Sequence, residues 1–142
     1  MVKQVSIFLE NRAGRLYEVS NTLAKNKLNI RALSIADTSD FGILRLIMDD
    51  PDRAIDVLKK ENYTVSATDV LAIEVDDNPG GLAKILGIFD ENKINIEYMY
   101  AFLGKLPEKA IMIFRFDNNK LVLEKLKNKE VKFIDARDLY SL

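Results

Sequence analysis

The second half of the chain repeats the first, with Gly80 following Gly14 by 66 residues. Between residues 11–30 and 77–96, six of twenty positions are identical: Gly14/Gly80, Leu16/Leu82, Asn26/Asn92, Lys27/Lys93, Asn29/Asn95 and Ile30/Ile96. The apolar differences are conservative, as in Val19/Ile85. Self-similarity at a fixed spacing indicates one structural unit per copy. We therefore predict two units, residues 1–68 and 69–142, and expect any site formed by the glycine turn to be present twice.

The length and net charge of the chain limit the kinds of partner that it can bind. With 142 residues, 48% of them hydrophobic and 30% charged, the composition is that of an ordinary globular protein. A unit of about 70 residues has a marginal core, so the halves should pack together or on a partner. A net charge of −1 provides no cationic field for a nucleic acid. No apolar run reaches the roughly 18 residues of a membrane span, and the N-terminus is unlike a signal peptide, so we expect no membrane and a cytoplasmic location.

Cysteine and histidine are both absent from the sequence. Their absence excludes thiol nucleophiles, disulfides, imidazole general bases and the usual zinc ligand sets. The paired acids Asp49-Asp50 and Asp76-Asp77 are typical of strand ends and turns rather than of an acid–base site. We predict that the protein is not an enzyme and holds no cofactor and no metal.

The first half predicts the element order βαββαβ. Val5, Ile7 and Leu9 alternate as in a strand, and after the glycine turn Leu16, Val19 and Leu23 recur at helical spacing. A hairpin follows, formed by strands over 29–36 and 42–48 with a turn at Thr38-Ser39-Asp40. Pro51 after an Asp-Asp pair begins a second helix that ends near Asn62. A short strand over 63–67 closes the unit.

The second half predicts the same order. Its elements are a strand over 70–75, a helix with Leu82, Ile85 and Phe89, strands over 95–103 and 110–116, a helix with Val122, Leu123 and Leu126, and a strand over 131–136. The hairpin turn Gly104-Lys105-Leu106-Pro107-Glu108 is longer than its counterpart. This order is typical of an α+β fold: two ferredoxin-like units in tandem, each an antiparallel sheet with helices on one face.

These features resemble the ACT domain, a small regulatory module that binds amino acids in metabolic enzymes. The turn Asp77-Asn78-Pro79-Gly80-Gly81-Leu82 matches the family's Asp-x-Pro-Gly-x-Leu pattern. Asn11-Arg12-Ala13-Gly14-Arg15-Leu16 departs from it, with Asn in place of Asp and Ala in place of Pro. The resemblance covers nearly the whole chain and implies two ACT units without a catalytic domain.

The glycine turns are the candidate ligand sites. Glycine after a strand allows close approach of backbone to a ligand, and the unpaired N–H groups at a helix start favour a carboxylate. Asn29-Ile30 and Asn95-Ile96 begin the next strands, where the amide side chains could contact an amino acid's ammonium and carboxylate. The alternative is structural: the glycines only make turns, and the asparagines only end the helices.

An aromatic run, Tyr98-Met99-Tyr100-Ala101-Phe102, lies in a predicted edge strand. In a strand, Tyr98, Tyr100 and Phe102 share one face and Met99 lies on the other. The stripe could pack inside the unit, but Tyr and Met are also enriched at interfaces. We predict that Tyr98, Met99, Tyr100 and Phe102 form an interface, and that the protein is a homodimer or larger, joined through strand edges over 29–36 and 95–103.

Two functions remain open on the sequence. The first is a sensor that binds a small amino acid at the turns and signals to a partner enzyme or regulator through its surface. The second is a constitutive interaction module, a regulatory subunit that binds no ligand. The fold alone does not choose between them.

Overall fold

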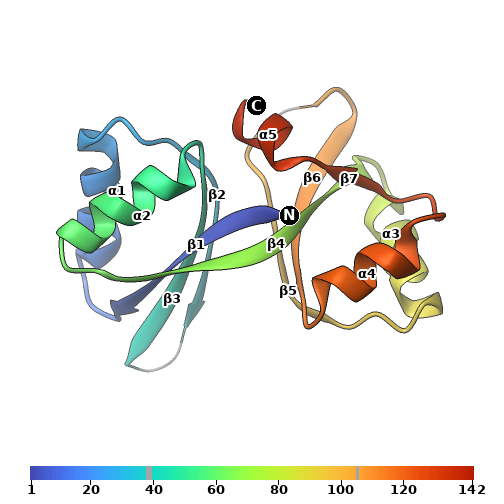
Figure 1. Ribbon diagram of the computed structural model, residues 1–142, viewed down its shortest axis with the longest axis horizontal. Helices are drawn as coiled ribbons and strands as arrows, with labels where there is room; N and C mark the ends of the chain where they lie inside the picture. Colours follow the sequence, from blue (N-terminus) through green and yellow to red (C-terminus); the bar gives the residue numbers. More distant parts are fainter. Residues whose placement is uncertain (38–39, 105) are drawn as a thin grey trace. The chain divides into compact units, whose positions relative to one another are not determined.

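The computed structural model describes residues 1–37, 40–104 and 106–142. They form two compact units: an N-terminal unit, Lys3–Thr68, and a C-terminal unit, Asp69–Leu142 together with Met1–Val2 (Figure 1). No helix in the described residues has the length and apolar content needed to cross a membrane.

The strands of the N-terminal unit are β1 (Val2–Glu10), β2 (Ile30–Asp37), β3 (Phe41–Met48) and the first part of β4 (Thr64–Asp76). Their order is β2-β3-β1-β4, so β2 lies at the edge. The β1/β3 and β2/β3 pairs are antiparallel, with Glu10 opposite Phe41 and Ile30 opposite Met48. The antiparallel hairpin and the edge position of its first strand are as predicted for a ferredoxin-like unit.

Two helices, α1 (Arg15–Lys25) and α2 (Pro51–Lys60), cover one face of these strands (Figure 1). The core between the layers contains Val19 and Leu23 from α1, Leu58 from α2, and strand residues such as Ile7. Asp50 begins α2 as predicted, because its carboxylate accepts the Arg53 N–H at 3.2 Å and a proline follows it.

The C-terminal unit repeats this arrangement with the second part of β4, then β5 (Ile96–Ala101), β6 (Lys109–Phe116) and β7 (Lys132–Ile134). β4 pairs antiparallel with both β6 and β7, and β5 pairs antiparallel with β6. Helices α3 (Gly81–Glu91) and α4 (Asn119–Leu126) bury Ile85, Phe89 and Val122 against the strands. The fold class is therefore the predicted one: antiparallel α+β units in tandem.

The identical Asn-Lys pairs of the repeat form helix C-caps. Lys27 (φ 56°) and Lys93 (φ 54°) are left-handed. After each, the next N–H reaches back to the helix, from Leu28 to the Leu23 carbonyl and from Ile94 to the Phe89 carbonyl. This is the Schellman arrangement, with its usual contact between the two apolar side chains. The asparagine before each lysine donates its side-chain N–H to the carbonyl four residues earlier, at 2.8 Å.

The structure differs from the sequence prediction at β4 and at the C-terminal segment. The predicted strands over 63–67 and 70–75 are one 13-residue strand, β4. The strand predicted over 131–136 is only Lys132–Ile134, because a short helix, α5 (Ala136–Tyr140), begins after Asp135. Five residues are too few to show helical periodicity in a sequence, although Leu139 is fully buried. In the two predicted hairpin turns, Thr38, Ser39 and Lys105 lie outside the described residues.

Candidate functional site

The glycine has the same conformation in both turns. Gly14 (φ 90°) and Gly80 (φ 89°) are left-handed and lie directly before α1 and α3. L-residues avoid this region, so glycine is required by conformation. It is not required by crowding, because a Cβ atom at either position would meet no atom within 4 Å.

Each turn presents helix amides to solvent. In the described part of the chain, the N–H groups of Leu16 and Tyr17 at α1, and of Leu82 and Ala83 at α3, have no hydrogen-bond partner. No side chain caps either helix. The first turn of α1 contains Glu18, whereas α3 has no acidic residue there. The start of α3 is therefore the more favourable of the two for an anion.

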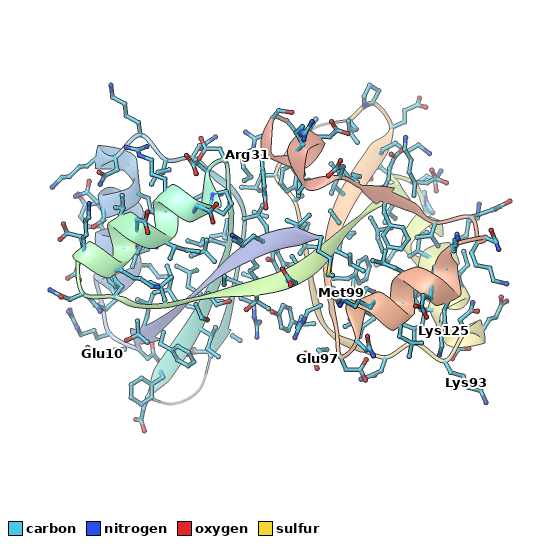
Figure 2. All side chains as sticks on the ribbon, in the orientation of Figure 1. Glu10, Arg31, Lys93, Glu97, Met99 and Lys125 are labelled. Atoms are coloured by element: carbon cyan, nitrogen blue, oxygen red, sulfur yellow. The ribbon has the colours of Figure 1, made fainter. Side chains whose placement is uncertain are left out.

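At the N-terminal turn, Arg15 is held by two contacts. Its guanidinium donates to Glu18 Oε2 at 2.8 Å and lies 5.0 Å from the centre of the Tyr63 ring. The hydrogen bond raises the pKa of Arg15 and lowers that of Glu18. Among the described residues, the buried Nε atom of Arg15 has no hydrogen-bond partner. Arg12 approaches Glu10, labelled in Figure 2, at 3.5 Å and Glu18 at 3.7 Å.

The space left at this turn is small. The cleft beside Arg15 has a volume of about 70 Å³. Its lining includes four predicted site residues, Asn11, Arg12, Arg15 and Leu16, together with Leu9, Glu10, Ile35, Asp37 and Gly42. Ala13 and Gly14 are exposed and lie outside this lining.

At the C-terminal turn, Gly81 opens onto a cleft of about 200 Å³. Three lysines and three carboxylates line it with Gly81 and Ile85: Lys84, Lys109, Lys132, Glu74, Asp76 and Glu130. The ion pair between Lys109 and Asp76 lowers the pKa of Asp76 and raises that of Lys109. A second hollow, lined by Asp76, Asp77, Asn78, Glu108 and Lys109, lies beside this pair. Of the other predicted residues here, Pro79, Gly80 and Leu82 are exposed.

The structure does not bring the strand-entry asparagines to the glycine turn of their own unit. The Asn11 N–H bonds the Asp40 carbonyl at one end of β3, and the Asn29 carbonyl accepts the Asp49 N–H at the other end. Nine residues at about 3.3 Å each separate these ends by roughly 30 Å. The C-terminal unit is alike: Asp77 bonds Glu108 before β6, whereas Ile96 is opposite Phe116 at its end. The turn and the following Asn of one unit therefore lie far apart, and their joint role in reading a ligand stays a prediction.

The asparagines and isoleucines have other surroundings. Asn29 and Asn95 are exposed, and the Asn29 N–H donates to Asp49 Oδ1 at 3.1 Å. Ile30 and Ile96 are partly buried against the helix-covered cores. In the alternative role the asparagines end the helices, but the C-cap residues are Asn26 and Asn92, each followed by a left-handed lysine, rather than Asn29 and Asn95.

The aromatic run lies on edge strand β5. Met99, labelled in Figure 2, packs against the helix-covered core, and the rings of Tyr98 and Tyr100 stack 6.5 Å apart. Tyr100 and Phe102 are only 8% and 6% exposed. An interface at this run stays a prediction, in which the edge of β5 and Tyr98 would contribute more than the buried rings.

Sequence reasoning missed the charged side chains around Gly81. Lys109 lies opposite Asp76 because of the β4/β6 register, and Lys132 lies opposite Glu74 because of the β4/β7 register. Neither register could be derived from the sequence, because the long hairpin turn and the short β7 leave the pairing open. One signal was available: in the repeat, the residue after the left-handed glycine is Arg15 in one unit and Gly81 in the other.

The chain is similar to several proteins of known structure. Protein BT0572 from Bacteroides thetaiotaomicron is 45% identical, with 99% of this chain and 96% of that chain covered and a TM-score of 0.91. The ligand-free regulatory subunit of aspartate kinase from Thermus thermophilus is 13% identical over 88% of this chain and 90% of that chain, with a TM-score of 0.62. The same subunit from Thermus flavus is 15% identical over the same shares, with a TM-score of 0.59. A search of curated proteins gave no match.

The similarity to the two Thermus subunits shows a shared fold. Membership of a protein family is shown instead by a match to a family model. The model described as an ACT domain pair matches residues 1–142, the whole of the sequence. The resemblance seen in the glycine turns and in the repeated element order is thereby confirmed. The chain belongs to the ACT domain pair family.

Proposed function

We propose that this protein is a non-catalytic regulator that binds a small amino acid at its strand-to-helix glycine turns. The observation that carries the proposal is the pair of left-handed glycines, each leading into a helix whose first amides have no partner. Such a helix start favours a carboxylate. Charged side chains of both signs surround each turn, which suits a zwitterion.

The family and the fold support a regulatory role. The two Thermus chains of similar fold are described as regulatory subunits of aspartate kinase. By analogy, the binding of an amino acid at the turns would be signalled to a partner enzyme or regulator through the protein surface. Among the described residues, no group of three or more acidic side chains is arranged to hold a metal ion, and the proposal needs none.

We also propose that the protein self-associates through the edge of β2. Four large apolar side chains on α1 and β2 are about half exposed or more: Leu16, Tyr17, Leu33 and Ile35. Three of them, Leu16, Tyr17 and Leu33, border an apolar groove of about 270 Å³. An edge strand beside such a surface is suited to pairing with a second copy. Light scattering should give a mass of at least twice 16.2 kDa, and Leu33→Asp should lower it.

The second candidate is a constitutive interaction module, favoured by the same apolar surface. A thermal-shift screen with the twenty amino acids separates the two functions. A ligand present at 100 times its dissociation constant stabilises the folded state by about 2.7 kcal/mol. A rise in melting temperature with one or a few amino acids supports the sensor. No rise with any of them, confirmed by calorimetry, would leave only the interaction module.

A further inference from the structure

The two units differ at the residue that follows the left-handed glycine. In the N-terminal unit this residue is Arg15, and in the C-terminal unit it is Gly81. The side chain of Arg15 lies against Tyr63, in the segment that leads from α2 into β4. The corresponding segment of the C-terminal unit, between α4 and β7, contributes Glu130 to the cleft beside Gly81.

In the N-terminal unit, the side chain of Arg15 therefore fills the space that remains open beside Gly81 in the C-terminal unit. Its side chain is 19% exposed, with the guanidinium bonded to Glu18 and stacked on Tyr63. The cleft of about 70 Å³ beside Arg15 lies toward β2, with Ile35 and Asp37 in its lining, and is therefore not the counterpart of the cleft of about 200 Å³ beside Gly81. Gly81 has no side chain and therefore contributes no group equivalent to the guanidinium to the C-terminal cleft.

The three ion pairs of the C-terminal cleft are held unequally. Lys109 and Asp76 are in close contact on neighbouring strands. Lys132, with a side chain 75% exposed, lies 3.1 Å from Glu74, whose side chain is only 13% exposed. Lys84 and Glu130 are 3.5 Å apart, with side chains 57% and 84% exposed. Exposed pairs of this kind contribute little to stability, so Lys84 and Glu130 are the two groups most easily separated by a ligand.

We propose that the cleft beside Gly81 is the amino-acid site of this protein and that it binds one ligand per chain, by exchange of the Lys84–Glu130 pair. The ligand's carboxylate bonds Lys84, on the first turn of α3, and its ammonium bonds Glu130. The corresponding cleft of the N-terminal unit does not bind, because Arg15 and Tyr63 occupy it. This inference rests on the proposed function and names its residues.

Calorimetry on the full chain tests the proposal, with the amino acid that gives the largest thermal shift as the probe. Lys84→Gln and Glu130→Gln each remove one charge of the exchanged pair. Lys120→Gln and Glu124→Gln make the same charge changes on exposed residues of α4 and serve as controls. All four change surface residues, and circular dichroism with denaturant melts checks that each variant is folded.

We expect one ligand per chain, about a ten- to hundredfold loss of affinity in each cleft variant, and no loss in the controls, because each cleft variant removes a charge-assisted hydrogen bond. Two equivalent ligands per chain, or unchanged affinity in both cleft variants, would overturn the assignment. If affinity were instead lost in Gly80→Val or Arg12→Gln alone, this inference would fail while the proposed function stood. If no amino acid bound to the wild type, both would fail.

Discussion

Replacing Gly81 with alanine tests the packing of α3 against the end of β4. A Cβ atom at position 81 would lie 1.9 Å from the carbonyl oxygen of Asp76 and 2.8 Å from its carbonyl carbon. Both are backbone atoms, so the start of α3 would have to move by about 1 Å to reach even a tight contact. Overpacking of this kind typically costs about 1–3 kcal/mol, partly offset by alanine's higher helix propensity of about 1 kcal/mol. Because the contact at 1.9 Å is with a backbone atom, we place the cost at the upper end of this range, about 3 kcal/mol, which leaves a net loss of about 2 kcal/mol.

Urea unfolding followed by circular dichroism measures this loss. With a denaturant slope of about 2 kcal/mol/M, a destabilisation of about 2 kcal/mol lowers the midpoint by about 1 M. Hydrogen exchange should show faster opening of α3 than of α1, since the change is confined to the C-terminal unit.

The matched control is Gly87→Ala in the same helix. Gly87 is exposed, and a Cβ atom there would meet nothing within 4 Å. Alanine should stabilise a helix interior by about 1 kcal/mol relative to glycine. If Gly81→Ala were as stable as the wild type, or were stabilised as much as Gly87→Ala, the argument that close backbone approach requires Gly81 would be refuted.

Three further predictions follow from the caps, the charges and the strand register. Lys93→Gly should stabilise the protein by up to about 1 kcal/mol in thermal melts, because glycine adopts the left-handed cap without the Cβ penalty; an unchanged stability would contradict that cap. The lowered pKa of Asp76 means that its contribution to stability is present above the carboxyl's unfolded pKa of about 4 and is lost as the pH falls through the folded value. Asp76→Asn should therefore flatten the acid limb of the stability curve, and an unaltered limb would argue against the Lys109 pair. Asn95→Ala should leave affinity at the C-terminal turn within about twofold by calorimetry, because Asn95 lies at the opposite end of the sheet; a loss of tenfold or more would show that another unit or copy brings it to the ligand.

Much of the fold follows from local patterns in the sequence. Alternating Val5, Ile7 and Leu9 and the helical spacing of Leu16, Val19 and Leu23 need no distant contact to be recognised. The left-handed conformation of the two glycines could also be predicted from the sequence, because a positive φ between a strand and a helix requires glycine. The repeat then extended these assignments to the second half. The family resemblance rested on the same local features.

The composition of the site depended on tertiary structure. Whether Asn95 meets the turn before α3 is decided by strand direction in the sheet, which places them at opposite ends. Whether Lys109 meets Asp76 is decided by strand register. Such pairings join residues far apart in sequence, and a shift of one residue would reverse the face of every side chain. The sequence alone determined the repeated units, their element order and the conformation of the glycine turns, because those depend on neighbouring residues. Only the tertiary structure decided which charges surround each turn, and that Arg15 fills a space left open beside Gly81, because these depend on how distant segments pack.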